Sequence, residues 1–186
     1  MSAQAPSSGE ARLSGSAPSG EQSRLSEQQL SDRVRTEIDG WVARFPEGRQ
    51  RSAVLGALMA AQHENHGYLT REQMDAVAEY LEMPPIQVYE VATFYSMLET
   101  EPVGRTCISV CTNISCMLQG SDEIVAYIEN KLGIKLGEST PDGRIYLKRE
   151  EECLAACCGA PMMMLDHTYH ENLTPEKVGA ILEELA

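Results

Sequence analysis

The sequence predicts an α+β protein in which an N-terminal helical bundle precedes a β-α-β-β-α domain. Apolar residues recur at helical spacing through residues 26–99. After Pro102 the pattern changes to short runs of strand composition, interrupted by two further helical segments. A chain of 186 residues with 42% hydrophobic side chains can bury a sizeable core, although only 5% of its residues are aromatic. We expect a mostly antiparallel sheet with helices packed on it.

Four helices are predicted in the N-terminal part, and capping signals mark where they begin. Ser26–Gln29 and Thr70–Gln73 both have the capping-box pattern that opens a helix. The pair Pro84–Pro85 is expected to break the third helix and start the fourth. The positions predicted to be buried are Leu30, Val34, Ile38, Trp41, Val42, Phe45, Leu55, Leu58, Met59, Met74, Val77, Ala78, Leu81, Val88, Val91, Ala92 and Tyr95.

The C-terminal part is predicted to hold three strands and two helices. The sequence Pro141-Asp142-Gly143 is a strong turn signal before the second strand. Thr174 followed by Pro175 is the expected start of the last helix, because Pro is favoured at the first helical position. The predicted strands cover residues 106–110, 144–148 and 161–165, and the first of the two helices covers residues 121–132.

The charge and the N-terminus restrict the class of protein. A formal net charge of −13 argues against nucleic acid or an anionic membrane surface as the main partner. The same charge also has a simpler explanation, which is that it keeps the protein soluble. No apolar run reaches the roughly 18–20 residues that span a bilayer. The N-terminus lacks the pattern of a secretory signal. Residues 1–25, rich in Ser, Gly, Ala and Pro, are expected to form a disordered tail on a bacterial-type cytoplasmic protein.

Six cysteines are the chemically informative residues of this sequence. In a reducing compartment such cysteines serve as metal ligands more often than as disulfides. Four residues separate Cys111 from Cys116, three separate Cys153 from Cys157, and thirty-six lie between the two pairs. The first pair follows a predicted strand and the second precedes one. Both pairs are therefore expected on loops at strand ends, where they can converge on one centre.

Thiolates are soft ligands, and four of them suit either zinc or an iron–sulfur cluster. Structural zinc sites usually have shorter spacings, often about two residues between cysteines. Loops of four and three residues can wrap a wider cluster and leave backbone N–H groups free to face sulfide. The spacing therefore favours iron–sulfur, while zinc and inert or redox-active thiols remain alternatives. The absence of a C-x-x-C motif disfavours a disulfide oxidoreductase.

Two cysteines are left over, and they differ in what they imply. Cys107 alternates with apolar neighbours in a predicted strand, so we expect it to be a small core residue. Cys158 directly follows Cys157, and by local geometry either neighbour could be the ligand.

The histidines and the glycines exclude several other sites. The segment His63-Glu64-Asn65-His66 falls one residue short of the zincin motif, because its histidines lie at i,i+3 rather than i,i+4. Ligation by His167 and His170 in a Rieske arrangement is unnecessary where four cysteines are available. The sequence contains neither a Rossmann fingerprint nor a P-loop. If the protein works with NADH or a flavin, we expect another chain to hold them.

Two segments carry a resemblance to a known family: Val110–Cys116, and Glu152–Cys157 with the following Ala160-Pro161. They resemble the thioredoxin-like [2Fe–2S] subunit of respiratory complex I, and the likeness covers about residues 30–185. Further segments similar to that family are Gln62–Leu69, Val88–Tyr95, Gly137–Thr140 with Asp142-Gly143, and Tyr169–Pro175. The chain departs from the family at Ala155, where many relatives carry Gly, at Cys158, and at Gln119, where many carry Arg.

The resemblance implies a thioredoxin-like [2Fe–2S] domain over residues 100–186 and a helical docking domain over residues 26–99. It selects Cys111, Cys116, Cys153 and Cys157 as the ligands of one [2Fe–2S] cluster. It implies a subunit of NADH:quinone oxidoreductase, a translocase, that accepts single electrons near the FMN of a partner flavoprotein, the chain that oxidises NADH. Other peripheral-arm subunits of complex I are further expected partners. The expected location is the cytoplasmic side, peripheral to the bacterial inner membrane.

Two alternatives remain at this point. Related chains serve NAD-linked hydrogenases and formate dehydrogenases, where fold and cluster are the same and the partners differ. A zinc-stabilised interaction domain would be a different class, and it would give no EPR signal on reduction.

Within the main hypothesis, Glu151 and Glu152 beside Cys153 are expected to lower the cluster potential. Phe94 and Tyr95 are candidate anchors for the flavoprotein.

Overall fold

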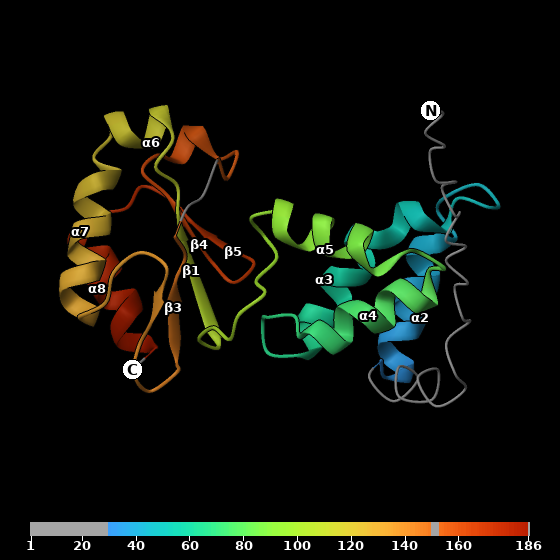
Figure 1. Cartoon of the computed structure of the whole chain (residues 1–186). Coiled ribbons are helices and arrows are strands. Elements are labelled where there is room, and N and C mark those ends of the chain that lie inside the picture. The colour runs from blue at the N-terminus through green and yellow to red at the C-terminus, as the bar shows by residue number, and fades with distance from the viewer. Residues whose placement is uncertain (1–29, 150–152, 186) are drawn as a thin grey trace, which may run out of the picture.

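The computed structural model describes residues 30–149 and 153–185 and confirms the predicted α+β architecture. A helical part and a sheet with its own helices follow one another along the chain, as Figure 1 shows. The predicted disordered tail over residues 1–25, the capping box at Ser26–Gln29 and the acidic pair Glu151 and Glu152 lie outside the described residues.

The first described helix begins at Asp32 with Ser31 as its cap, and not as a continuation of a helix through Leu30, whereas the break at Pro84–Pro85 is as predicted. The Ser31 hydroxyl accepts a hydrogen bond from the backbone N–H of Val34, at 3.2 Å, and thereby caps the first described helix. Thr70 and Gln73 form the predicted capping box, with bonds of 3.2 and 3.0 Å between side chain and backbone. The helical elements are α2 (Asp32–Val42), the 3₁₀ turn η1 (Gln50–Ala53), α3 (Val54–Glu64), α4 (Arg71–Tyr80) and α5 (Pro85–Phe94).

The core of the helical part contains most of the predicted residues, with two corrections. Trp41 packs so closely on α3 that a Cβ added at Gly56 would lie 2.4 Å from its ring. Phe45 and Tyr95 were predicted to be buried and are instead 37% and 38% exposed. Both follow the last residue of a helix, so helical spacing no longer directs their side chains inward. The fully buried members of this core include Ile38, Leu58, Leu69, Val77, Leu81 and Val88.

The C-terminal part is a five-stranded sheet in the order β2-β3-β1-β4-β5. Only the pair β1–β3 is parallel among the described strands, so the mostly antiparallel prediction is confirmed. The short strands β2 and β5 and the short helix α6 were not predicted. The elements are β1 (Thr106–Val110), α6 (Ile114–Leu118), α7 (Ser121–Leu132), β2 (Glu138–Ser139), β3 (Ile145–Leu147), η2 (Cys157–Gly159), β4 (Met163–Leu165), β5 (Thr168–His170) and α8 (Pro175–Glu184).

A second core lies between this sheet and the two long helices of the C-terminal part. Figure 1 shows α7 and α8 side by side on one face of the sheet. Alternate residues of β1 face them, because successive side chains of a strand point to opposite faces. This core contains Ile108, Val110, Ile124, Ile128, Leu147, Met163, Val178 and Leu182.

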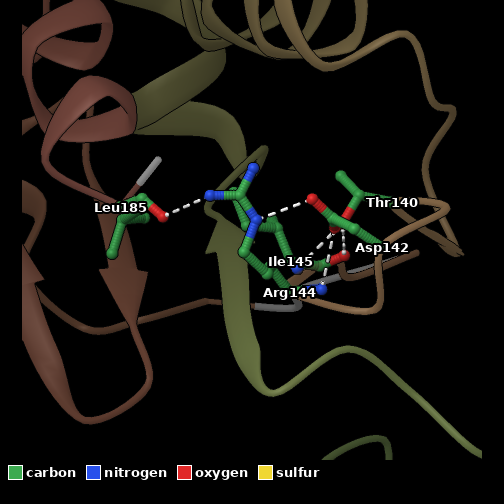
Figure 2. Close-up of polar contacts among 5 residues, drawn as sticks. All are labelled: Thr140, Asp142, Arg144, Ile145 and Leu185. Atoms are coloured by element: carbon green, nitrogen blue, oxygen red, sulfur yellow. Dashed lines mark hydrogen bonds and ion pairs between the residues drawn. The ribbon is translucent and has the colours of Figure 1, made fainter.

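The turn before β3 ties the end of the chain to the sheet, as Figure 2 shows. The Arg144 guanidinium donates to Asp142, at 2.6 Å, and to the backbone carbonyl of Leu185, at 3.2 Å. The Thr140 hydroxyl, the Arg144 backbone N–H and the Arg144 side chain hold the pKa of Asp142 well below its usual range. The predicted turn is therefore held by a local polar network at the end of α8.

A ring contact joins the two parts, and a backbone hydrogen bond holds the end of the helical part in place before the sheet begins. The N–H of Leu69 donates to the carbonyl of Glu99, at 2.8 Å, which fastens the connecting segment to the helical part. The rings of His63 and His167 meet edge to face, with centroids 5.1 Å apart. Those two residues come from α3 and from the β4–β5 turn, so the contact spans both parts. None of the helices in the described ranges has the length and apolar character that crossing a bilayer requires.

Candidate metal centre

The pairing of two strands brings both cysteine segments to one edge of the sheet. Strands β1 and β4 are antiparallel neighbours, with Val110 opposite Met163. The end of β1 and the start of β4 therefore lie side by side. The pairing continues one residue further, where the N–H of Cys111 donates to the carbonyl of Met162, at 3.1 Å. The first segment begins at that point, and the second ends there.

The first segment turns directly into α6, which buries its second cysteine. The side-chain oxygen of Asn113 accepts from the N–H of Ile114, at 2.7 Å, and caps the helix. Cys111 lies just before this cap and is 3% exposed, and Cys116 lies on the inner side of the helix and is 1% exposed. Both pack with Leu154 of the second segment. The first cysteine pair is thus embedded in apolar contacts.

The second segment places its cysteines closer to the surface. Cys153 and Cys157 are both exposed, and Cys157 begins the 3₁₀ turn η2. The backbone N–H of Ala155 donates to the sulfur of Cys153, at 3.4 Å. Ala155 has a φ of +58°, in the left-handed region that favours glycine. Glycine would adopt this conformation with less strain than alanine does.

The thiols of the two segments influence one another and receive backbone donors. Burial acts to raise the pKa of Cys111, but the backbone N–H groups of Leu154 and Asn113 and the thiols of Cys116 and Cys153 outweigh it and lower that pKa. These groups come from both cysteine segments. Hydrogen bonds of this kind stabilise a thiolate, the form that binds metal.

The second buried thiol has the opposite balance. Burial and the neighbouring thiol of Cys111 raise the pKa of Cys116 to about 11, against the effect of the backbone N–H of Met162. Cys157 also acts to raise it. Two adjacent thiols cannot both ionise easily without a cation between them. Cys116 therefore interacts electrostatically with thiols in both segments. The positive charge of a bound metal would offset the repulsion between their thiolates.

The chemistry of this donor set fits an iron–sulfur cluster. Cys111, Cys116, Cys153 and Cys157 supply four thiols at one edge of the sheet, and backbone N–H groups face three of these sulfurs. Over residues 30–149 and 153–185, no group of three or more His, Cys, Asp or Glu side chains is arranged around a single metal ion. A [2Fe–2S] cluster takes two ligands on each of two irons, so its four ligands do not surround one point.

The two remaining cysteines lie at the other end of β1 and directly beside a proposed ligand. Cys107, predicted to be a core residue, is half-buried at the other end of β1, and burial raises the pKa of its thiol. Its backbone N–H donates to the Asp166 carboxylate, at 2.8 Å. Cys158 is exposed beside Cys157. The short helix α6 was missed, although Asn113 as a cap before the spacing Ile114, Met117 and Leu118 was a usable signal.

Comparison with known proteins identifies the family of this chain. Residues 38–186 match the family model described as thioredoxin-like [2Fe-2S] ferredoxin. The chain is 45% identical over 150 residues to an NADH-quinone oxidoreductase subunit from Rhizobium meliloti (strain 1021), covering 81% of this chain and 87% of that protein. It is also 45% identical over 144 residues to an NADH-quinone oxidoreductase subunit from Rickettsia bellii (strain RML369-C), covering 77% and 86% respectively.

A solved structure shows the same fold in a different setting. A chain of an NAD⁺-reducing [NiFe]-hydrogenase in the air-oxidised state superposes with a TM-score of 0.59 at 19% sequence identity. The match covers 69% of this chain but only 22% of the hydrogenase chain, so the chain spans about a fifth of that protein. At this identity the likeness concerns the fold alone. The family match and the 45% identity over most of each relative are decisive, and the chain belongs to the thioredoxin-like [2Fe–2S] ferredoxin family.

Proposed function

We propose that this chain is the electron-transfer iron–sulfur subunit of an NADH:quinone oxidoreductase, with Cys111, Cys116, Cys153 and Cys157 as the cluster ligands. The observation that carries the proposal is the convergence of the two cysteine segments where β1 ends and β4 begins. When bound, a [2Fe–2S] cluster takes up and gives back single electrons. Relatives at 45% identity are subunits of NADH-quinone oxidoreductase, an oxidoreductase complex.

The chain's own groups prepare the site for negative charge. Backbone N–H groups of Asn113, Leu154, Ala155 and Met162 face sulfur atoms of the cysteines. Such donors stabilise thiolates and shift a cluster potential in the positive direction. Apolar packing around the first pair keeps water away on the inner side. The second pair is exposed, so electrons have their shortest route to a partner on that side.

The choice of Cys157 over Cys158 is part of the proposal. Cys157 interacts electrostatically with the thiol of Cys116, and this supports Cys157 as the neighbour of the other ligands. Cys158 is exposed, and its thiol is not required for a complete set of four ligands.

We assign FMN and NADH to a partner flavoprotein. The sequence contains no glycine-rich phosphate loop, so the nucleotide chemistry needs another chain. The helical part is the proposed docking arm, because Phe94 is 79% exposed at its end and meets Tyr95 edge to face. Exposed aromatic pairs of this kind often contribute strongly to an interface. Through that complex the chain would be peripheral to the inner membrane, on the cytoplasmic side.

Two alternative functions can be weighed against this proposal. A role in an NAD-linked hydrogenase is supported only by a fold-level match at 19% identity. The match to quinone oxidoreductase subunits is at 45% identity over most of their length. A zinc-stabilised interaction domain would use the same thiols and carry no electrons.

The test is to purify the full chain with its native partners and record EPR spectra with and without NADH. We expect a paramagnetic [2Fe–2S] signal after reduction, and co-purification of an FMN-containing chain. The isolated, flavin-free chain should not oxidise NADH. NADH oxidation by that chain, or stoichiometric zinc in place of iron and sulfide, would refute the proposal.

A further inference from the structure

Two histidines that lie far apart in the sequence meet where the two parts of the chain touch. His63 lies in the last turn of α3, and His167 lies in the turn between β4 and β5. Their ring centroids are 5.1 Å apart, and the ring planes are inclined by 79°. Both residues are exposed, so ions from the solvent can reach the pair. The fold thus brings together one histidine from each of two separate short motifs.

The spacing of the two rings is that of two imidazoles bound to one metal ion. A metal–nitrogen bond of about 2.1 Å places a ring centroid roughly 3.2 Å from the ion. Two rings at a tetrahedral angle around the ion then have centroids about 5.2 Å apart. The observed separation is 5.1 Å. Ring rotation without movement of the backbone is therefore sufficient to direct one nitrogen of each imidazole at a shared ion.

Hydrogen bonds of neighbouring residues hold the backbone that carries each histidine. The N–H of Asp166 donates to the carbonyl of Cys107, at 2.9 Å, and the Asp166 carboxylate accepts from the N–H of Cys107, at 2.8 Å. These two bonds attach the β4–β5 turn to β1. On the other side of the pair, Gln62 is buried next to His63, and its side chain bonds to the connecting segment. Ligands that are held in advance lose less conformational freedom when an ion binds.

The surroundings of the pair favour a cation. His63 lies at the C-terminal end of α3, where the helix dipole is negative. Glu64 and Asp166 directly adjoin the pair in the sequence, in a chain whose formal net charge is −13. Glu64 accepts a hydrogen bond from the Ser31 hydroxyl, at 2.7 Å, and Asp166 is bonded to β1. Both carboxylates therefore supply negative charge nearby and leave the coordination to the imidazoles.

We propose that His63 and His167 together bind one divalent transition-metal ion of the class of Zn²⁺ and Ni²⁺, for which neutral imidazole is a suitable ligand. Over the ranges that the structure describes, no third His, Cys, Asp or Glu completes a site around one ion, so water takes the remaining positions. Such an ion exchanges with the solution, unlike zinc in a structural site with four protein ligands. Because its ligands come from both parts of the chain, the bound ion fastens the helical part to the sheet. This inference is independent of the proposed function.

The experiment uses the full-length, cluster-loaded chain under anaerobic conditions, with Ni²⁺ alone as the probe. His63→Gln and His167→Gln each remove one imidazole and keep a polar side chain. The matched control is His66→Asn, at an exposed histidine whose φ of +56° asparagine tolerates. Calorimetry gives the dissociation constant and the stoichiometry, and circular dichroism gives the midpoint of thermal unfolding. Iron analysis before and after the titration shows that the cluster is retained.

We expect one Ni²⁺ per parent chain, and at least about tenfold weaker binding by each of the two Gln variants, because one of two protein ligands is lost. Ni²⁺ should raise the thermal midpoint of the parent and of His66→Asn, but not that of either Gln variant. Parent-like affinity in both Gln variants would assign the ion to other groups, such as the exposed Cys158 thiol, and would overturn the inference.

Three other results would also contradict it. A parent chain that does not bind Ni²⁺ would exclude the site. Equal weakening in His66→Asn would place the ion at the end of α3 and not between the two parts. Binding that leaves the thermal midpoint of the parent unchanged would exclude the fastening of the two parts. Each of these results leaves the proposed function intact, because that function is tested by the EPR signal of the cluster.

Discussion

The side chain of Gln62 fastens the segment around Glu99 to the middle of the helical part. Its carbonyl oxygen accepts from the backbone N–H of Glu99, at 2.7 Å, and its amide nitrogen donates to the backbone carbonyl of Met97, at 3.0 Å. Gln62 is only 9% exposed, so these bonds are shielded from water. One side chain therefore determines where the chain leaves the helices and enters the sheet.

Replacing Gln62 by Leu should destabilise the protein. The substitution keeps a similar size but leaves two backbone groups without their partners, which costs about 1–3 kcal/mol for a buried site. Urea unfolding followed by circular dichroism measures the change. Gln87→Leu is the matched control, because Gln87 only accepts a bond from the Arg51 side chain on the surface. Equal stability of the two variants would show that the Gln62 bonds contribute nothing net.

The ligand assignment predicts a sharp division among the six cysteines. Cys111→Ser, Cys116→Ser, Cys153→Ser and Cys157→Ser should each lose or strongly alter the cluster, because each removes a soft thiolate. Iron should fall from about two per chain toward zero, as measured by iron and sulfide analysis.

Cys107→Ser and Cys158→Ser should keep the visible spectrum of the parent, and they are the controls for this series. The choice between the neighbours is tested directly by alanine variants. A normal cluster in Cys157→Ala together with its loss in Cys158→Ala would assign the fourth ligand to Cys158.

Glu99 should make the protein less stable as pH rises. Burial raises the pKa of Glu99, against the effects of Lys148, the Tyr146 hydroxyl and Arg149. The folded state therefore holds this proton to a higher pH than the unfolded state does, and the stability falls between the unfolded and the folded pKa. Glu99→Gln removes this dependence, so its unfolding free energy relative to the parent should increase as the pH rises above the pKa of an unfolded glutamate.

Glu129→Gln is the control with the opposite sign. The Lys135 ammonium and the backbone N–H of Leu136 lower the pKa of Glu129, so its ionised form stabilises the fold above the unfolded pKa. The variant should therefore lose stability relative to the parent as the pH rises toward the unfolded pKa, and the difference should stay constant above that pKa, where the effect of Glu99 begins. Parallel curves for Glu99→Gln and the parent would contradict the prediction for Glu99.

A fragment of residues 100–186 should hold the cluster by itself. The second core and all four proposed ligands lie within it. It should bind the flavoprotein more weakly than the full chain does, because the docking arm is removed. EPR of the reconstituted fragment and its dissociation constant measure the two effects. A soluble, folded fragment without a cluster would refute a self-contained site, and unchanged affinity would refute the docking role of the arm.

The capped and periodic elements could be predicted because their signals are local. Thr70 and Gln73 satisfy one another three residues apart, and the structure confirms this box. The helix Ser121–Leu132 was predicted at its observed bounds from its apolar period. Tyr95 was placed in the core because it continues that kind of period. The helix ends one residue earlier, at Phe94, so Tyr95 faces a different direction.

The shortest elements were not predicted, because their local signals are weak or absent and contacts between distant residues help to hold them. Strand β5 has no periodic signal, and it forms because Met163 and Leu165 pair with His170 and Thr168 across a two-residue turn. Helix α6 has only five residues, and its apolar stripe faces outward, opposite to what burial would favour. Such a helix is stabilised by its cap and by the packing of Cys116 beneath it.

The sequence by itself determined the cysteine spacing, the uncharged segments around the cysteines, and the change from helical to strand patterning near Pro102. Composition and local periodicity are sufficient for these features. The tertiary structure alone decided that Cys111 and Met162 pair at 3.1 Å, which joins the two cysteine segments. It also decided that the first pair is buried and the second exposed. The physical reason is that strand order and burial depend on how residues far apart in sequence pack together.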